Sequence, residues 1–128
     1  MEQDGTEPPV ILIVDDEVDI GEVMVRMVRR LLPAAVVGAV LGAAQAIEVL
    51  LVQRTDVVLT DLRMPDMGGA QRAQIIKTRW PTTSVIIFSG STEEVLREIA
   101  QQVQADAYLV KPFSRAELAK VLLPLLGR

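Results

Sequence analysis

The sequence predicts an α/β fold: one doubly wound sheet of five parallel strands with helices on both faces. Short apolar runs rich in β-branched residues occur five times along the chain, each followed by apolar residues at helical spacing. Alternating strands and helices are joined by right-handed crossovers, so the strands are expected to lie parallel. A chain of 128 residues, 50% of them hydrophobic, suits a single domain with a full core.

The first strand and helix have the clearest pattern. Residues 10–14 (VILIV) form a continuous apolar run, as expected for a strand covered on both faces. A helix should follow, with acids at its start, arginines at its end and Pro33 as terminator. Its predicted buried stripe consists of Ile20, Val23, Met24, Met27, Val28, Leu31 and Leu32.

The second and third units are less regular. Residues 35–40 form an apolar run, and the helical stripe after it consists of Ala43, Ala46, Ile47, Leu50 and Leu51. Glycine and alanine blur the boundary between the two. Residues 56–60 (DVVLT) are the third strand, leading into Asp61. The loop LRMPDMGG has the proline and glycines of a turn before a helix at about residues 70–80, which Pro81 ends.

The last two units complete the sheet. Residues 84–88 (SVIIF) and 107–110 (AYLV) are the fourth and fifth strands. Between them, a hydroxyl followed by glutamate (Ser91, Thr92, Glu94) is typical of a capped helix start, and the stripe there is Val95, Leu96, Ile99 and Val103. The last stripe is Leu118, Val121, Leu122, Leu125 and Leu126, and Pro124 is expected to kink or end that helix.

Composition excludes several kinds of function. Without cysteine or histidine, the chain has no thiolate nucleophile, no Ser–His hydrolase site and no phosphohistidine of its own. A net charge of −4 and few aromatics argue against direct binding of nucleic acid. There is no signal peptide and no apolar run of membrane-spanning length, so we expect a cytoplasmic protein. Residues 1–9 are expected to be a loose tail before one domain at residues 10–128.

Reactive side chains follow four of the five predicted strands, where sheets of this type bind ligands. These are Asp15 and Asp16 after the first strand, Asp61 after the third, Ser89 after the fourth and Lys111 after the fifth. Three converging carboxylates would repel one another unless a cation or protons neutralise them, and an all-oxygen site suits Mg²⁺ or Mn²⁺. Asp61 can then act as a nucleophile that forms an aspartyl phosphate. Lys111 and the Ser89 hydroxyl can bind phosphoryl oxygens.

Each of these residues also has an ordinary structural explanation. The acidic pair after the first strand could favour a helix start, and Asp61 could lie in a turn. Ser89 could cap a strand end and Lys111 could simply be solvated. Independent coincidences would have to place all five side chains after four strands of one sheet, so a shared functional site is the preferred interpretation.

The chain resembles a response-regulator receiver domain over about residues 10–126. The resemblance is carried, in order, by the segments ILIVDDE, DVVLTDLRMPDMGG, FSG and YLVKPF. It implies a flavodoxin-like sheet with strand order 2-1-3-4-5 and a role in a two-component system. In that role Asp61 takes a phosphoryl group from a partner histidine kinase or histidine phosphotransfer protein, in a Mg²⁺-dependent reaction. The resemblance further implies that the domain would catalyse only its own phosphorylation and dephosphorylation and would switch its partner-binding surface.

The resemblance also implies which residues hold the metal. Asp16 and Asp61 would be ligands, Asp15 would act mainly through water, and Arg63 would contribute its backbone carbonyl. The Arg63 side chain, two residues after the phosphorylation site, is expected to affect the lifetime of the aspartyl phosphate. The segment GAVLGAAQAIEVL departs from the more polar loop that the family often has before its second helix.

Further implied roles concern the phosphoryl group and its detection. Ser89 and Lys111 would sense the phosphoryl group. The rotamer of Tyr108 would couple the site to the surface formed by the fourth helix, fifth strand and fifth helix, through which a homodimer could also form. The Lys111–Pro112 peptide bond is expected to be cis. Tyr108 could also be an ordinary core residue with its hydroxyl at the rim.

Three other functions share parts of this pattern. A haloacid-dehalogenase-like phosphatase also forms an aspartyl phosphate, but it usually has a second acid where this chain has Arg63. A flavodoxin-like flavin-binding module would have hydroxyls and glycines after the first strand, where this chain has DDEVD. A receiver that binds partners without phosphorylation would not need the full set of site residues found here.

Overall fold

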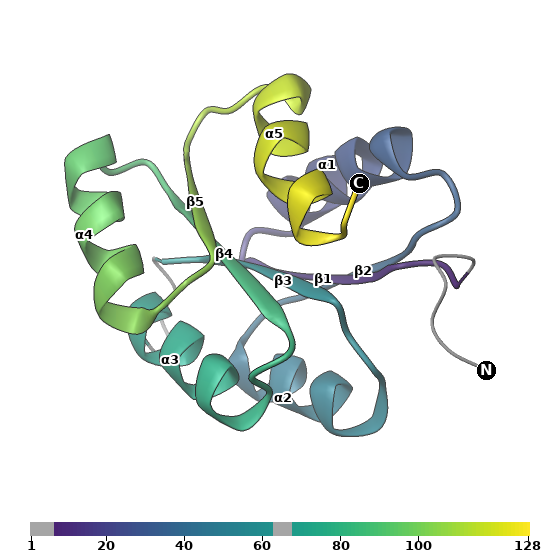
Figure 1. Cartoon of the computed structure of the whole chain (residues 1–128), viewed down its shortest axis with the longest axis horizontal. Helices are drawn as coiled ribbons and strands as arrows, with labels where there is room; N and C mark the ends of the chain where they lie inside the picture. Colours follow the sequence, from purple (N-terminus) through teal and green to yellow (C-terminus); the bar gives the residue numbers. More distant parts are fainter. Residues whose placement is uncertain (1–6, 63–67) are drawn as a thin grey trace.

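The computed structural model describes residues 7–62 and 68–128, and its architecture confirms the predicted fold class (Figure 1). Within these residues one parallel sheet has the order β2-β1-β3-β4-β5, as the resemblance implied. The strands are β1 (Val10–Val14), β2 (Val36–Val40), β3 (Val57–Asp61), β4 (Ser84–Ser89) and β5 (Ala107–Val110). The helices are α1 (Val18–Leu31), α2 (Ala43–Val52), α3 (Gly69–Arg79), α4 (Glu93–Val103) and α5 (Arg115–Leu125).

Helices cover both faces of the sheet and create two apolar clusters. α1 and α5 lie on one face, while α2, α3 and α4 lie on the other (Figure 1). The central strands β1 and β3 are buried along their whole length because each is covered from both sides. This explains why their sequences are continuous apolar runs rather than alternating ones. None of the helices in the described segments has both the length and the hydrophobicity needed to cross a membrane.

The predicted elements are correct to within a residue or so, and two of the differences concern the site. Asp61 is the last residue of β3 and Ser89 the last residue of β4, so both belong to the sheet. The third helix begins and ends one residue earlier than predicted. Of the predicted tail, residues 1–6 lie outside the described residues, whereas Pro9 is buried and the Pro8 carbonyl accepts a hydrogen bond from Arg54 at 3.4 Å.

Three apolar residues that were predicted to be core are on the surface instead. Val23 is 45% exposed, Leu51 is 60% exposed and Val95 is 44% exposed. Each lies at the margin of its helical stripe, next to a residue that is buried: Met24, Leu50 and Leu96. Helical spacing identifies the apolar side of a helix, but the width of the covered stripe depends on the neighbouring elements.

The helix caps differ in part from the predicted ones. Thr92 is the N-cap of α4, where its hydroxyl accepts from the Val95 N–H, so the predicted arrangement with Glu94 is not the one used. A full capping box is found in α5 between Ser114 and Glu117. The α5 helix ends at Leu125, one residue after Pro124, as a proline near the end should cause. The Lys111–Pro112 peptide bond is cis, as predicted.

The segment before α2 was the least regular part of the sequence, and a side chain organises it. Gly42 is the N-cap of α2 and has no side chain to offer. The Gln45 side chain instead folds back and accepts a hydrogen bond from the Leu41 N–H at 2.7 Å. A polar residue in the first turn of α2 therefore fixes the chain where β2 ends.

Candidate functional site

The strand register brings the predicted acids to one edge of the sheet. β1 and β3 pair directly with Val14 opposite Thr60, so Asp15 and Asp61 follow at neighbouring positions. Asp15 is held there by its own N–H, which donates to the Val40 carbonyl at 3.1 Å. Asp16 comes next in the chain, before α1 begins. The edge on which parallel strands end is where such folds place their ligands.

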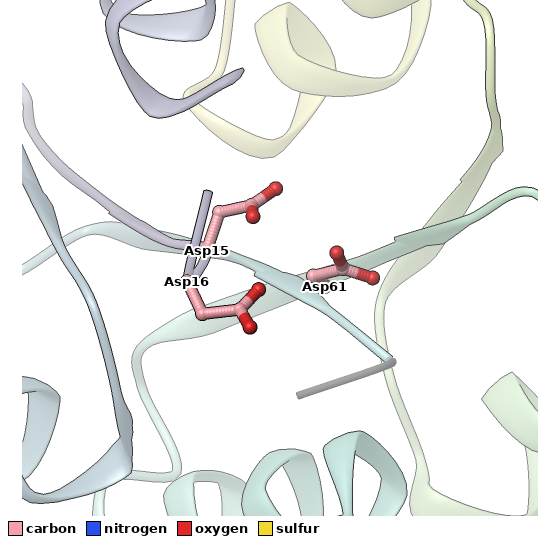
Figure 2. Close-up of side chains that lie close together, drawn as sticks. All are labelled: Asp15, Asp16 and Asp61. Carbon is pink, nitrogen blue, oxygen red and sulfur yellow. The ribbon is translucent and has the colours of Figure 1, made fainter. Parts of the chain in front are cut away.

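The three carboxyl groups form one cluster (Figure 2). One oxygen from each of Asp15, Asp16 and Asp61 lies within 4.8 Å of the other two. Asp15 and Asp61 are buried, being 1% and 4% exposed, whereas Asp16 is exposed. Two buried carboxylates and one open to solvent give a site that is fixed on one side and accessible on the other.

Asp15 has one satisfied and one unsatisfied oxygen. Its Oδ1 accepts a hydrogen bond from the Glu17 N–H at 2.9 Å. Its Oδ2 is buried and has no hydrogen-bond partner among the described residues. Burial raises the pKa of this carboxyl above 3.8, and the charge of Asp61 raises it further, while the Glu17 N–H and the Lys111 charge lower it. A buried carboxylate oxygen without a donor is the group that a bound cation would satisfy.

Lys111 is the positive group of the cluster. Its Nζ lies 3.2 Å from Asp61 Oδ2 and 3.8 Å from Asp15 Oδ2. Its N–H donates to the Ser89 carbonyl at 2.7 Å, and its Nζ lies 5.1 Å from the centre of the Phe88 ring. Backbone pairing and ring contact therefore direct the ammonium group toward the two buried acids.

The structure brings Ser89 to the same edge and places Tyr108 farther out. Ser89 is 1% exposed, and its hydroxyl lies 3.2 Å from that of Ser91. Tyr108 is half-buried on β5 against the cluster that α2, α3 and α4 cover, and its hydroxyl donates to Glu93 Oε2 at 3.2 Å. The tyrosine therefore links β5 to the first turn of α4.

Sequence reasoning missed Arg72, which lies directly behind Asp61. Arg72 is on α3 and is only 1% exposed. Its Nε donates to Thr60 Oγ1 at 2.7 Å and its Nη2 donates to the Asp61 carbonyl at 2.6 Å. The sequence did contain an indication of its role: a cationic residue stands four positions before the buried Ile76, on the same side of the helix. A charged residue in that stripe is seldom fully buried unless it is paired.

Gly69 allows α3 to start against the end of β3. Its N–H donates to the Leu62 carbonyl at 3.1 Å, and a Cβ at this position would lie 2.7 Å from the Asp61 carbonyl oxygen. Only glycine permits this approach without a shift of the backbone. Arg63, whose carbonyl was predicted to be a metal ligand, lies outside the described residues.

The oxygen cluster has the chemistry of a Mg²⁺ site. Mg²⁺ binds oxygen ligands at about 2.0–2.1 Å, so two ligands on opposite sides of the ion lie about 4.2 Å apart. One oxygen from each of the three acids lies within 4.8 Å of the other two, close enough for one divalent ion to be held by all three. The buried Oδ2 of Asp15, which has no hydrogen-bond partner among the described residues, also indicates a cation site.

Asp15→Asn is expected to stabilise the metal-free protein at neutral pH by on the order of 1 kcal/mol, because it removes a buried, incompletely satisfied charge. The folded wild type binds the Asp15 proton more tightly than the unfolded chain does. Its stability therefore falls as the pH rises from 3.8 through the raised pKa. The asparagine variant lacks this loss, so the difference between the two should grow with pH. Urea denaturation in chelator from about pH 4 to about pH 8 measures it.

The matched control for this prediction is Asp16→Asn. Asp16 is exposed, so its charge is solvated in both the folded and the unfolded chain. We expect a stability change of less than about 0.5 kcal/mol for this variant. A constant difference between Asp15→Asn and wild type across the pH range would contradict the assignment of the effect to the buried charge.

Comparison with known proteins agrees with the fold. The profile of the response regulator receiver domain matches residues 11–123. The DNA-binding transcriptional regulator NtrC of Proteus hauseri is 35% identical over 103 residues, which are 80% of this chain and 21% of that protein. The probable transcriptional regulatory protein NarL of Mycobacterium tuberculosis is 32% identical over 113 residues, 88% of this chain and 52% of that protein.

A solved structure shares the whole fold. The signal receiver domain of an HD domain-containing protein from Pseudomonas fluorescens Pf-5 has a TM-score of 0.85 at 24% identity, and the match covers 94% of this chain and 96% of that one. The chain spans about half or less of the length of the two regulators named above. The alternative of a haloacid-dehalogenase-like phosphatase has no support in these similarities. With a family match over residues 11–123 and the predicted strand order, the chain belongs to the response regulator receiver domain family.

Proposed function

We propose that Asp61 accepts a phosphoryl group from a phosphohistidine on a partner kinase or phosphotransfer protein. The observation that supports this most directly is the position of its carboxylate. Asp61 is 4% exposed, its Oδ2 lies 3.2 Å from Lys111 Nζ, and its neighbours in the carboxylate cluster are Asp15 and Asp16. A carboxylate held between a lysine and a metal site is suited to nucleophilic attack on phosphorus.

The proposed reaction moves one phosphoryl group. A carboxylate oxygen of Asp61 attacks the phosphorus atom, the phosphorus–nitrogen bond of the donor breaks, and the imidazole leaves with the electron pair of that bond. Because this sequence contains no histidine, the donor histidine lies outside these 128 residues. When the Asp61 carboxylate becomes an acyl phosphate, Lys111 pairs with a phosphoryl oxygen. The Ser89 hydroxyl donates a hydrogen bond to another phosphoryl oxygen.

A divalent ion completes the proposed site. Asp15, Asp16 and Asp61 would hold Mg²⁺ or Mn²⁺, and the backbone carbonyl of Arg63 is a further proposed ligand. When bound, the ion supplies positive charge that neutralises the phosphoryl oxygens. We also propose that the Arg63 side chain affects the lifetime of the aspartyl phosphate.

Phosphorylation is proposed to act on a partner surface through Ser89 and Tyr108. Ser89 lies at the end of β4, and Tyr108 links β5 to α4 through Glu93. Movement of the serine hydroxyl toward the phosphoryl group would change the space beside β5, to which the tyrosine ring can respond. The surface formed by α4, β5 and α5 is the proposed site of the changed interactions, including a homodimer.

The chain is proposed to act only on itself, with no free substrate turned over. Its partners would be a histidine kinase or phosphotransfer protein, and the output depends on what the receiver is joined to or binds. Two relatives are named transcriptional regulators, and this chain matches only part of each. DNA binding in such a protein would belong to a separate domain.

Intact mass after incubation with Mg²⁺ and phosphoramidate tests the proposal. The wild type should gain the mass of one phosphoryl group, and chelator should prevent the gain. Asp61→Asn should stay unlabelled, while Asp19→Asn, which removes an exposed acid from the first turn of α1, should label like the wild type. Equal labelling of the wild type and Asp61→Asn would overturn the assignment.

A further inference from the structure

We propose that β2 pairs with β2 of a second copy of this chain, joining two sheets across a two-fold axis. β2 is an edge strand of the sheet. Edge strands present unpaired backbone groups, and natural proteins usually protect them with charged residues or proline. The strand sequence VVGAV has neither, and no charged residue occurs between Arg30 and Glu48. The proposal does not depend on the chemistry of Asp61.

The hydrogen bonds from β1 to β2 define which residues of β2 face inward. The Val36 N–H donates to the Pro9 carbonyl at 2.8 Å, and the Val40 carbonyl accepts from the Asp15 N–H at 3.1 Å. Successive residues of a strand direct their backbone groups to opposite sides. The backbone N–H and C=O groups of Val36 and Val40 therefore point toward β1. Those of the residues that alternate with them point away from the sheet.

Val37 and Ala39 are the residues whose N–H and C=O groups point away from the sheet. In an antiparallel pair with Val37 opposite Ala39 of the second copy, these two residues exchange both hydrogen bonds, and the two-fold axis repeats the exchange. Gly38 then lies at the axis, opposite its own equivalent. Val36, which is 47% exposed, lies opposite Val40 of the second copy and would be covered by it.

α1 lies close to this edge and leaves a groove beside it. A Cβ at Gly21 would lie 3.4 Å from the Cβ of Ala39, so α1 packs closely on β2 at this point. A groove of about 360 Å³ runs along the edge, with Val18, Val25 and Leu41 among its apolar residues. The groove would receive side chains of whatever pairs with β2.

The charges of α1 favour a second copy as that partner. The start of α1, together with the residue before it, is acidic, and its second half is basic. The acids are Glu17, Asp19 and Glu22, and the basic residues are Arg26, Arg29 and Arg30. This order also suits the helix dipole, and it makes the helix complementary to an antiparallel copy of itself. The axis is perpendicular to the sheet, so both α1 helices lie on the same face and run in opposite directions.

The spacing allows the two helices to touch. Paired strands lie about 4.8 Å apart. α1 packs on both β2 and β1. A helix axis midway between these two strands lies about 2.4 Å in from β2, which places the axes of α1 and its copy roughly 10 Å apart, a usual packing distance for helices. Glu22 of one copy faces the basic half of the other near Arg26, and both residues line the groove. A partner with charge of one sign would meet repulsion along half of α1.

Gly38→Glu tests the strand pairing. A Cβ at Gly38 meets nothing within 4 Å in the single chain, whereas in the dimer the glutamates would place two carboxylates directly opposite each other. Sedimentation equilibrium should show a wild-type dimer whose dissociation constant rises at least about tenfold in this variant. Val95→Lys, on the exposed side of α4, perturbs the other proposed dimer surface, formed by α4, β5 and α5, and should leave the β2 dimer of the unphosphorylated chain unchanged. A wild type that stays monomeric up to about 100 μM, or a dimer broken only by Val95→Lys, overturns the proposal.

A charge exchange tests the helix arrangement. Glu22→Arg and Arg26→Glu should each dimerise more weakly than the wild type, because each gives α1 like charges at the meeting point. An equimolar mixture of the two variants should form a heterodimer, since one copy then carries two arginines where the other carries two glutamates. Pairing within one helix cannot produce this rescue. A mixture that associates no better than either variant alone overturns the two-fold arrangement.

Discussion

Arg72→Ala is expected to lower the free energy of unfolding by about 3–5 kcal/mol. Arg72 is the largest of the fully buried side chains among the described residues, so its truncation leaves a cavity. It also removes the donors that bind Thr60 Oγ1 and the Asp61 carbonyl at 2.7 and 2.6 Å. Urea denaturation measures the loss. A change within about 0.5 kcal/mol of wild type would contradict the structural role.

Arg72→Met separates packing from hydrogen bonding and charge. Methionine restores much of the buried volume but none of the donors, so we expect a loss of about 1–3 kcal/mol. Because the arginine holds the backbone of Asp61, both variants should also be phosphorylated more slowly by phosphoramidate, under conditions where they remain folded. Arg79→Ala is the control on the same helix. Its exposed side chain stacks 4.8 Å from the Trp80 ring, and its loss should cost about 0.5–1 kcal/mol or less and leave the rate unchanged.

Lys111→Met is expected to move two properties of the site in opposite directions. Phosphorylation should slow by on the order of 100-fold, because the charge that develops on the phosphoryl oxygens loses its cationic partner. Mg²⁺ affinity should rise, because Asp15 and Asp61 lose a positive charge at 3.8 and 3.2 Å that competes with the ion. Methionine retains the side-chain stem beside the Phe88 ring.

Two measurements on the same samples decide this prediction. The rate comes from intact mass over time, and the Mg²⁺ affinity comes from the rise in Tm with metal concentration. Lys111→Arg keeps the charge and serves as the control, with Mg²⁺ affinity expected to remain near that of the wild type. Weaker Mg²⁺ binding by Lys111→Met together with an unchanged rate would contradict the proposed role of the ammonium group.

The fold could be predicted from the sequence because each element carries its own local pattern. The continuous apolar runs of β1 and β3 reflect burial on both faces, and helical spacing separates them from the helices. The positions of Asp15, Asp61, Ser89 and Lys111 were accessible for the same reason. Each lies at or just after the end of a strand, and the ends of parallel strands share one edge.

The residues that escaped prediction depend on partners far away along the chain. Arg72 is buried because Thr60 and Asp61, 12 and 11 residues earlier, accept its hydrogen bonds. Val23, Leu51 and Val95 have apolar side chains at helical spacing, yet no neighbouring element covers them well. A periodic pattern describes one helix, whereas burial is decided by what packs against that helix.

The sequence by itself determined that this chain is a doubly wound α/β domain with acids, a hydroxyl and a lysine at the ends of its strands. Only the tertiary structure decided the state of each group: Asp15 has an unsatisfied buried oxygen, and Arg72 is hydrogen-bonded behind Asp61. The physical reason is that chemistry and local conformation are properties of short segments. Solvent exclusion and charge pairing arise only when distant segments meet.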